Sequence, residues 1–312
     1  MEHNLIAKIV KKTKDNPLWP GGYILRKVLS RYLPDETYVK WQFFFAMGKF
    51  PDLENPRTFS EKLQWLKLYC RKPEYTAMVD KLAVKRHVAS VIGEEHVIPT
   101  LGVWDRPEDI DWDRLPDRFV LKTTHGAGNE GVVICRDKRK LDVRKTVRVL
   151  AKCLRKDMYA EWREWPYKDI PKRILAEELI EPHAGGTDLA DYKFFCFDGV
   201  VKGLFVATGR QDPNEDVKFD FFDADYNHLP FRQGHDHART VPPKPANFDL
   251  MKSLAARLAA GMPHVRVDLY DLGDRVMFGE LTLYHFGGLV RFEPEEWDAR
   301  IGDMLRLPAR EP

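Results

Sequence analysis

The 312-residue sequence lacks a long apolar run, an excess of one charge and any closely spaced pair of cysteines. Its densest apolar cluster, at 43–47, is far shorter than the roughly 20 residues that a membrane-spanning helix needs. Its 50 Lys and Arg nearly balance 48 Asp and Glu, whereas a nucleic-acid-binding protein carries a basic surplus that neutralises phosphates. These absences argue against a membrane-spanning protein and against a dedicated nucleic-acid binder.

The four cysteines lie far apart and form no Cys-x-x-Cys pair. Neither a zinc ribbon nor a disulfide framework is therefore expected, and a reducing, cytoplasmic location is the default expectation. Lysines between positions 8 and 14 interrupt any apolar core near the start, so we expect no signal peptide.

Positive charge is concentrated near the beginning of the chain. Through Leu33 there are seven basic residues and only two acidic ones. Such a segment suits peripheral contact with the anionic inner face of a membrane, although a solvated helical face is the commoner explanation.

Apolar residues recur at helical spacing in four stretches, which predict helices over 59–69, 76–92 and 143–154 and a fourth behind Asn247. Thr58 and Glu61 form a capping-box pattern at the start of the first, and Gly93 ends the second.

Short β-rich runs lie between these helices, at 118–122, 132–135, 174–180, 192–197, 200–208, 265–270 and 276–281. Asp198-Gly199 is a strong signal for a two-residue hairpin turn, and 271–274 links another pair of runs. Most adjacent strands should therefore be antiparallel, which predicts an α+β fold.

A run at 119–133 has the composition of a phosphate-binding loop. A buried strand ends in Lys122 and passes into a loop containing Gly126, Gly128 and Gly131. Glycines let backbone N–H groups approach phosphate oxygens closely, and a lysine supplies a point charge. The spacing matches neither of the common nucleotide-binding glycine motifs, so a glycine-rich hairpin with an exposed lysine is the alternative.

The run at 265–282 predicts a cation site. Alternation puts Arg266, Asp268 and Tyr270 on one strand face, and Glu280 and Thr282 on one face of the returning strand. Two carboxylates and a hydroxyl beside an arginine suit Mg²⁺ bound to phosphates. The alternative is a salt bridge of little energetic value on the surface of a hairpin.

Two further strands carry charged residues among apolar ones. In 175–180, Glu177 and Glu178 should face opposite sides of the strand. The exposed backbone could then contact a base, and an acidic side chain could contact a ribose. An ordinary strand at the edge of a sheet is the simpler explanation. Lys193 shares a face with Asp191 and Phe195, and it either reaches a nucleotide or forms a cross-strand ion pair.

Two other patterns are weaker. His235-Asp236-His237, with His228 nearby, hints at a transition metal, but the sequence shows no fourth ligand and a solvated loop is favoured. Asp223-Ala224-Asp225 has the DxD form of many glycosyltransferases, and we interpret it as a turn.

Taken in this order, the stretches resemble the ATP-grasp superfamily, and within it the TupA-like group that is found with bacterial surface-polysaccharide and teichuronopeptide genes. The likeness runs from about residue 55 to about residue 307. Its parts are 59–67, 79–81, 119–122, 161–167, 191–197 and 266–282.

The resemblance implies an ATP-grasp fold of the α+β class, in which two α+β subdomains clasp the nucleotide behind a helical N-terminal region. The expected divisions are a basic helical segment at 1–54, a helical region at 55–117, a lid subdomain at 118–182, and a C-terminal subdomain with the metal site at 183–312.

The resemblance also implies ATP and Mg²⁺ as cofactors and assigns roles to individual residues. The expected nucleotide-binding residues are Lys81, Lys122, Thr123, Gly126, Gly128, Glu177, Glu178, Leu179 and Ile180. The expected metal ligands are Asp268, Glu280 and Thr282. The expected catalytic residues are Arg266, which would stabilise an acyl phosphate, with Lys193 and His125.

The implied activity is ATP-dependent ligation of a carboxylate, such as that of a uronic acid or polymer, to an amine, such as that of an amino acid. An acyl-phosphate intermediate and a role in building or decorating a surface polysaccharide are part of that expectation. Residues 283–288 replace the proline- and glycine-rich turn of the group, which leaves the substrate open. The alternatives are a glycosyltransferase using Asp223 and Asp225, a kinase of the same fold, and a nucleotide-sensing module at the membrane.

Overall fold

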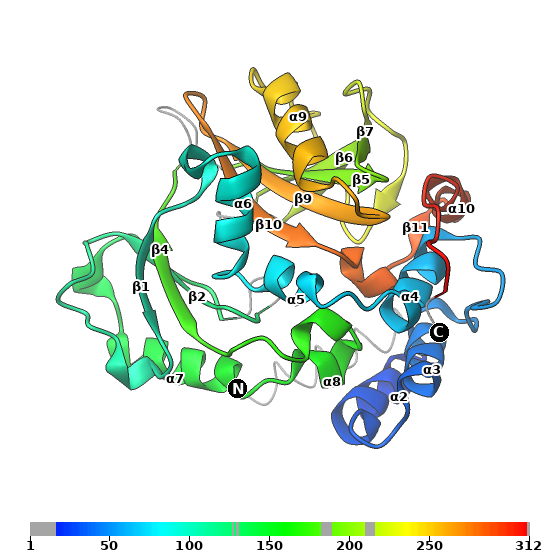
Figure 1. Cartoon of the computed structure of the whole chain (residues 1–312), viewed down its shortest axis with the longest axis horizontal. Helices are drawn as coiled ribbons and strands as arrows, with labels where there is room; N and C mark the ends of the chain where they lie inside the picture. Colours follow the sequence, from blue (N-terminus) through cyan, green and yellow to red (C-terminus); the bar gives the residue numbers. More distant parts are fainter. Residues whose placement is uncertain (1–16, 127, 129–130, 182–188, 210–215, 311–312) are drawn as a thin grey trace.

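The computed structural model describes residues 17–126, 128, 131–181, 189–209 and 216–310. Within this part, N-terminal helices lead into two main antiparallel sheets, and Figure 1 shows the smaller sheet at the left and the larger one above and to its right. The α-helices are α2 (Trp19–Ile24), α3 (Asp35–Met47), α4 (Phe59–Tyr69), α5 (Glu74–Val79), α6 (Val84–Ile92), α7 (Val143–Leu154), α8 (Met158–Trp162), α9 (Phe248–Leu258) and α10 (Glu296–Gly302). The strands are β1 (Thr100–Trp104), β2 (Phe119–Thr123), β3 (Val133–Cys135), β4 (Ile174–Glu178), β5 (Asp191–Phe197), β6 (Val200–Thr208), β7 (Lys218–Asp223), β8 (Arg232–Gln233), β9 (His264–Asp271), β10 (Val276–Thr282) and β11 (Phe292–Glu293).

The smaller sheet has the strand order β1-β4-β2-β3. Burial alternates along β2, where Phe119 and Leu121 are fully buried and Val120 and Lys122 are partly exposed. The buried face packs in one cluster with Leu150 of α7, so the other face is left to line a cavity.

The larger sheet has the order β10-β9-β5-β6-β7. All seven residues of its central strand β5 are buried because both faces are covered. α9 covers one face, as Figure 1 shows, and on the other the ring of Phe59 in α4 contacts Phe195 and Phe197 edge-on. Asp198 and Gly199 both have positive φ, which confirms the predicted tight hairpin turn.

Three of the four predicted helices are confirmed as α4, α7 and α9, with the capping box of Thr58 and Glu61 in place. The single helix predicted over 76–92 is wrong, because the chain forms α5 and α6 with a break at 80–83. The Asp80 carboxylate accepts hydrogen bonds from the backbone N–H groups of Leu82 and Ala83 at 2.8 and 3.3 Å. A local bond of this kind competes with the helical ladder, and Lys81 lies in the break.

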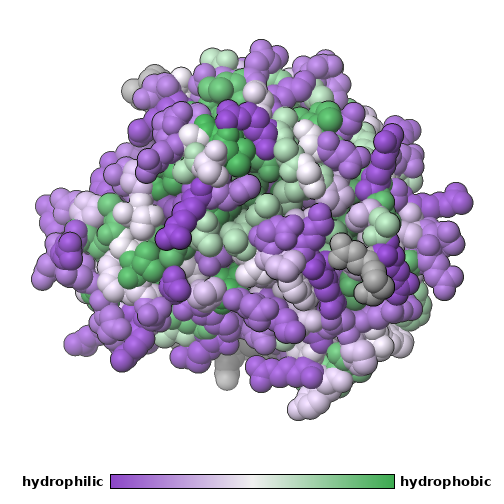
Figure 2. All heavy atoms as spheres, in the orientation of Figure 1, coloured by the Kyte–Doolittle hydropathy of each residue, from purple (hydrophilic) through white to green (hydrophobic). Residues whose placement is uncertain are grey.

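The seven predicted β-rich runs all form strands, and β1, β7, β8 and β11 were missed. The basic positions between 8 and 14 lie outside the described residues. Among the helices that are described, none combines the length and the apolar character needed to cross a membrane. On the face drawn in Figure 2, hydrophilic side chains predominate and hydrophobic ones form small patches.

Candidate functional site

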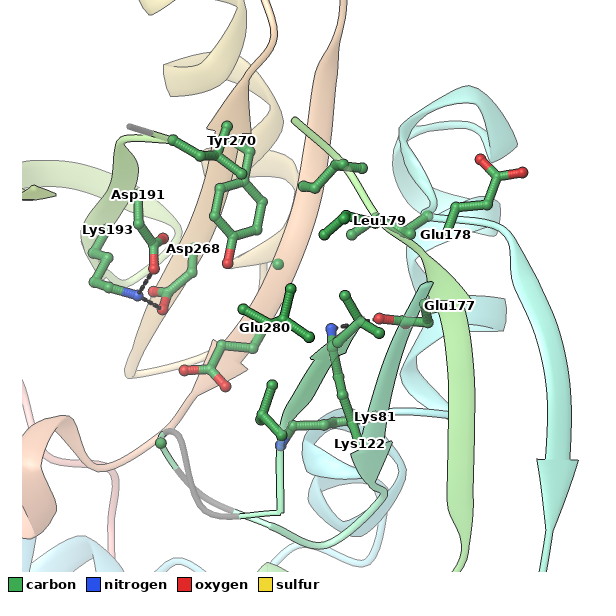
Figure 3. A pocket seen from close by; sticks show the side chains of 18 residues that line it. Lys81, Lys122, Glu177, Glu178, Leu179, Asp191, Lys193, Asp268, Tyr270 and Glu280 are labelled. Carbon is green, nitrogen blue, oxygen red and sulfur yellow. Dashed lines mark hydrogen bonds and ion pairs between the residues drawn. The ribbon is translucent and has the colours of Figure 1, made fainter. Parts of the chain in front are cut away.

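A pocket of about 340 Å³ lies where the two sheets meet. That volume is at the lower end of the range typical of small-molecule sites. Figure 3 shows Lys81, Lys122 and Glu177 on one side of it and Lys193, Asp268 and Glu280 on the other. The lining residues are Lys81, Ile98, Val120, Lys122, Gly128, Val132, Ile134, Glu177, Glu178, Leu179, Ile180, Leu189, Asp191, Lys193, Asp268, Tyr270, Gly279 and Glu280.

On the small-sheet side, a buried carboxylate holds two lysines. Glu177 of β4 pairs with Lys122 of β2 and, at 2.7 Å between Nζ and Oε1, with Lys85 of α6. Burial acts to raise the pKa of Glu177, but the two lysines outweigh it and the pKa is lowered. Glu177 therefore stays ionised and fixes the position of Lys122 at the pocket wall.

Lys81 connects the helix break to the glycine loop. Its backbone N–H donates to the Thr124 carbonyl at 3.1 Å, and its Nζ donates to the Gly126 carbonyl. Burial lowers the pKa of Lys81, the carboxylates of Glu280 and Glu177 oppose that change, and Lys122 adds to it. The break thus places a second cation beside Lys122.

On the large-sheet side, a β-bulge brings two carboxylates together. The pairing of β9 with β10 shifts by one residue between Phe278 and Glu280, so Glu280 lies directly opposite Asp268. Without the shift, Gly279 would oppose Asp268 and Glu280 would project from the other face. A Cβ at Gly279 would lie 3.0 Å from the Tyr270 ring and 3.1 Å from the Asp268 carbonyl, so the close approach favours glycine.

Arg266 binds both of these acids. Its Nε and Nη2 donate to the two oxygens of Asp268, each at 2.7 Å, and Nη2 also donates to Glu280 at 3.1 Å. Lys193 pairs with Asp268 and, at 2.6 Å, with Asp191. The cross-strand ion pair expected of Lys193 is thus present, and the same side chain lines the pocket.

The charges around Glu280 keep it ionised. Burial opposes ionisation, but Lys81, Lys193 and Arg266 lower the pKa of Glu280 to about 2. Burial also acts to raise the pKa of Asp268, against the opposing effects of Arg266 and Lys193. The Glu280 side chain is 35% exposed, so its oxygens are accessible from the pocket.

This donor set fits Mg²⁺ bound to a polyphosphate. Asp268 and Glu280 offer carboxylate oxygens, which are ligands that Mg²⁺ prefers, and the lysines opposite would neutralise phosphates. Thr282 donates its hydroxyl to Glu280 at 3.3 Å and does not line the pocket. In this structure its hydroxyl therefore contacts an expected metal ligand and does not itself face the pocket.

Several predicted residues occupy positions other than those expected. Arg266 lies behind the two acids and outside the pocket lining. Glu177 lines the pocket but its carboxylate is paired with two lysines, and the Glu178 carboxylate points away from the other labelled side chains (Figure 3). The expected contact of a carboxylate with a ribose stays a prediction. Thr123 is buried, and the Gly126 carbonyl is bonded to Lys81.

His125 does not reach the pocket, which corrects the expected phosphate contact. Its side chain lies with Nε2 3.2 Å from the Cys153 carbonyl, and the residue is 2% exposed. Burial, followed by the nearby charge of Lys172, lowers the pKa of His125 to about 4. The imidazole is therefore neutral at pH 7 and serves packing of the loop against α7.

Residues 283–288, where the sequence departs from the turn of the TupA-like group, brace Arg266 against α4. His285 is fully buried, with Nδ1 2.9 Å from Nη1 of Arg266. The Gly287 carbonyl accepts from Gln64 at 2.8 Å and from Lys67 at 2.7 Å.

Sequence reasoning missed Lys85, Asp191 as a contact of Lys193, and the apolar wall formed by Ile98, Val132 and Ile134. Lys85 was within reach of a sequence argument, because it follows Lys81 by four residues. The apolar wall had no such signal, since its members come from distant segments.

The Asp223-Ala224-Asp225 turn is confirmed. The Asp223 carboxylate accepts from the backbone N–H groups of Asp225 and Asn227, both at 2.9 Å. Its oxygens are thus used within the turn, which removes the basis for a nucleotide-sugar site there.

A protein-family profile described as TupA-like ATPgrasp matches residues 61–306. No curated protein matches the sequence. Among solved structures, the ATP-grasp ligase PsnB complexed with minimal precursor, Mg and ADP is 12% identical, over 72% of this chain and 57% of that one, with a TM-score of 0.39.

Two other solved structures are similar to the same degree. D-alanine–D-alanine ligase from Bacillus anthracis is 17% identical over 66% of this chain and 57% of that one, with a TM-score of 0.39. A RimK domain ATP-grasp protein from Sphaerobacter thermophilus is 14% identical over 74% and 69%, with a TM-score of 0.40. The chain spans less than two thirds of the length of PsnB and of the Bacillus anthracis ligase.

Proposed function

This protein belongs to the TupA-like ATP-grasp family, whose profile matches most of its length, and we propose that it is an ATP-dependent ligase that joins a carboxylate to an amine. The substrate carboxylate would attack the γ-phosphate of ATP to give an acyl phosphate and ADP. The amine would then displace phosphate and form an amide.

One observation carries this proposal: cations and anions face each other across a single pocket. Lys81 and Lys122 line the small-sheet side, while Asp268 and Glu280 line the large-sheet side. A nucleotide triphosphate bound between them would meet positive charge directly and would meet the acids through Mg²⁺. We propose that the nucleotide binds between the lid subdomain at 118–182 and the C-terminal subdomain at 183–312.

The rest of the pocket suits an adenine ring. Val120, Ile134 and Leu179 contribute apolar surface at the small-sheet side, and the backbone of 178–180 follows β4 at the edge of the pocket. Apolar walls with a few fixed polar groups are typical of a site for a planar ligand.

In this mechanism the protein positions groups and stabilises charge. Asp268 and Glu280 would hold Mg²⁺, which when bound offsets charge on the transferring phosphoryl group. Lys122, fixed by Glu177, would bind phosphate oxygens. Arg266 and Lys193 would hold the acids in place, and the loop that contains Gly128 would exclude water from the reactive acyl phosphate.

We propose a role in synthesis or amino-acid decoration of a bacterial surface polysaccharide, with a uronic acid as one possible carboxylate. Support comes from the resemblance to the TupA-like group alone. The substrates are therefore to be found by a screen in which ADP release is measured over pairs of uronic acids and amino acids with ATP and Mg²⁺.

ADP release in this screen should require both a carboxylate and an amine. Lys122→Met should lower it by on the order of 10²-fold, because one fixed charge on the phosphates is lost, whereas Lys140→Met, at a side chain that is 84% exposed, should match the wild type. A phosphorylated product formed without any amine would identify a kinase instead, and nucleotide-sugar binding without ATP binding would contradict the proposal.

We also propose that the N-terminal helices contact an anionic membrane surface. Tyr23, Ile24 and Val28 are 46–57% exposed. Beside them, a second pocket is lined by six basic and two acidic residues: Arg26, Lys27, Arg31, Lys152, Arg155, Lys156, Asp157 and Glu161. Exposed apolar side chains next to clustered basic ones suit a headgroup layer.

Cosedimentation with phosphatidylglycerol vesicles tests this contact. The protein should pellet with them and should remain in solution with phosphatidylcholine vesicles. Val28→Asp should reduce the bound fraction several-fold, whereas Leu250→Asp, at an exposed apolar position on α9, should not. Equal binding to both vesicle types, or none, would rule the contact out.

A further inference from the structure

Three potential metal ligands converge at a place away from the nucleotide pocket. Asp220 of β7, His228 and His237 lie with their ligand atoms within 4.8 Å of one another. His228 Nε2 is 3.1 Å from Asp220 Oδ1, His237 Nδ1 is 3.0 Å from His228 Nε2, and His237 Nδ1 is 3.5 Å from Asp220 Oδ1. The two histidines come from the segment 224–247 between β7 and α9, here called the excursion after β7.

The position of this cluster separates it from the proposed ATP site. Asp220 pairs with Val206, whereas Lys193 and Asp268 lie in the ladder row of Phe205 and Phe221. Side chains alternate along a strand, so Asp220 projects from the opposite face. It also belongs to the edge strand farthest from β10.

The three ligand atoms have too few protons for each of their mutual contacts to be a hydrogen bond. His237 Nε2 is 2.8 Å from the Phe231 carbonyl, which can only accept, so this contact selects the tautomer with its proton on Nε2 and a lone pair on Nδ1. Asp220 Oδ1 is also an acceptor. His228 Nε2 contacts both and has at most one proton to share between them, whereas a cation would satisfy all three.

The triangle also matches tetrahedral coordination. Ligand atoms bound to zinc at 2.0–2.1 Å lie roughly 3.3 Å from each other, and the three separations here range from 3.0 to 3.5 Å. Two contacts orient the ligands from behind: the Phe231 carbonyl on His237 and the Ala238 N–H, which donates to Asp220 Oδ2 at 3.1 Å. Metal-binding side chains are commonly held in this way.

The charge of Asp220 is a second, independent reason for a cation. Its side chain is fully buried, and among the described residues its ion-pair partners within 4.0 Å are the two histidines, with no lysine or arginine. A buried carboxylate without a cationic partner is costly, and a divalent metal would compensate it.

From this geometry we propose that Asp220, His228 and His237 bind a zinc ion that fastens the excursion after β7 to the sheet edge. Two imidazole nitrogens and one carboxylate oxygen suit zinc better than the oxygen-preferring Mg²⁺. His228 is 30% exposed on its side chain, which leaves room for water as the fourth ligand. Asp220 is thus the third ligand beside the two histidines, and it lies outside the sequence pattern that first drew attention to them.

Zinc binding to untagged, chelator-treated full-length protein tests this site without ATP, so its outcome is independent of the proposed ligase activity. Equilibrium dialysis against zinc alone, followed by elemental analysis, should show one more bound zinc in the wild type than in His228→Gln or His237→Gln. Their affinity at this site should be at least about ten-fold weaker. His235→Gln is the matched control, because its ring packs on Phe219 at 4.4 Å and lies outside the cluster.

Cobalt(II) substitution supplies a second measurement. The wild type and His235→Gln should show the intense visible absorption of four-coordinate cobalt, and His228→Gln should lose it. Circular dichroism of each variant checks that the fold is retained, and the partly exposed His228 makes that outcome expected. Equal zinc binding by wild type and His228→Gln, or no zinc binding by the wild type, would show a hydrogen-bonded cluster without a metal and would overturn the proposal.

Discussion

Replacing Glu280 with Gln should lower ATP turnover by on the order of 10²–10³-fold while the protein stays folded. Lys81, Lys193 and Arg266 hold the pKa of this carboxyl at about 2, so its negative charge is present throughout the neutral range. Gln keeps the shape but removes the charge that would hold Mg²⁺ against the phosphates, and loss of one such stabilising group costs rates of this size. Steady-state ADP release at saturating ATP measures the effect.

Glu296→Gln is the matched control for this change. Glu296 is exposed in the first turn of α10 and does not line the pocket, so turnover should remain within a few-fold of the wild type. Mg²⁺ titration separates weaker metal binding from slower chemistry, because added Mg²⁺ restores only the former. Wild-type turnover in Glu280→Gln would show that this acid does not hold the metal.

Arg266→Leu should destabilise the protein by about 3–5 kcal/mol, which is the usual cost of removing one partner from a buried ion pair. Arg266 is 7% exposed, and it donates two bonds of 2.7 Å to Asp268 and one of 3.1 Å to Glu280. Without it, Lys193 is the one cationic partner that the buried Asp268 keeps among the described residues, and His285 loses its contact of 2.9 Å. Urea-induced unfolding followed by circular dichroism measures the change.

Arg275→Leu, at an exposed position in the turn between β9 and β10, should change stability by less than about 0.5 kcal/mol. The double variant Arg266→Leu with Asp268→Leu should recover part of the lost stability, because it removes the uncompensated charge. If Arg266→Leu alone unfolded at the same urea concentration as the wild type, the buried network would not contribute to stability as argued.

Local patterns were sufficient to predict much of the fold. The capping box at Thr58 and the apolar spacing in 143–154 are properties of a single helix, and both elements form where expected. Asp198-Gly199 specified a hairpin turn because few other residues adopt the positive φ angles that it requires. These signals act over a few residues, so the sequence displays them directly.

The helix break at Lys81 shows where such patterns fail. Apolar periodicity continues through 76–92, yet the Asp80 side chain bonds to Leu82 and Ala83 and stops the ladder. The competition between these two bonding patterns is close in energy, and the contact of Lys81 with the loop at Thr124 and Gly126 favours the break.

The sequence by itself determined which charged residues alternate along each strand, and hence that Asp268 and Glu280 would be near neighbours. Only the tertiary structure decided that they lie directly opposite each other, that Glu177 pairs with Lys122, and that Asp220 meets His228 and His237. The physical reason is the range of the interactions: periodicity and turn chemistry act within a segment, whereas a bulge, a buried ion pair or a ligand triangle depends on how distant backbones are placed relative to one another.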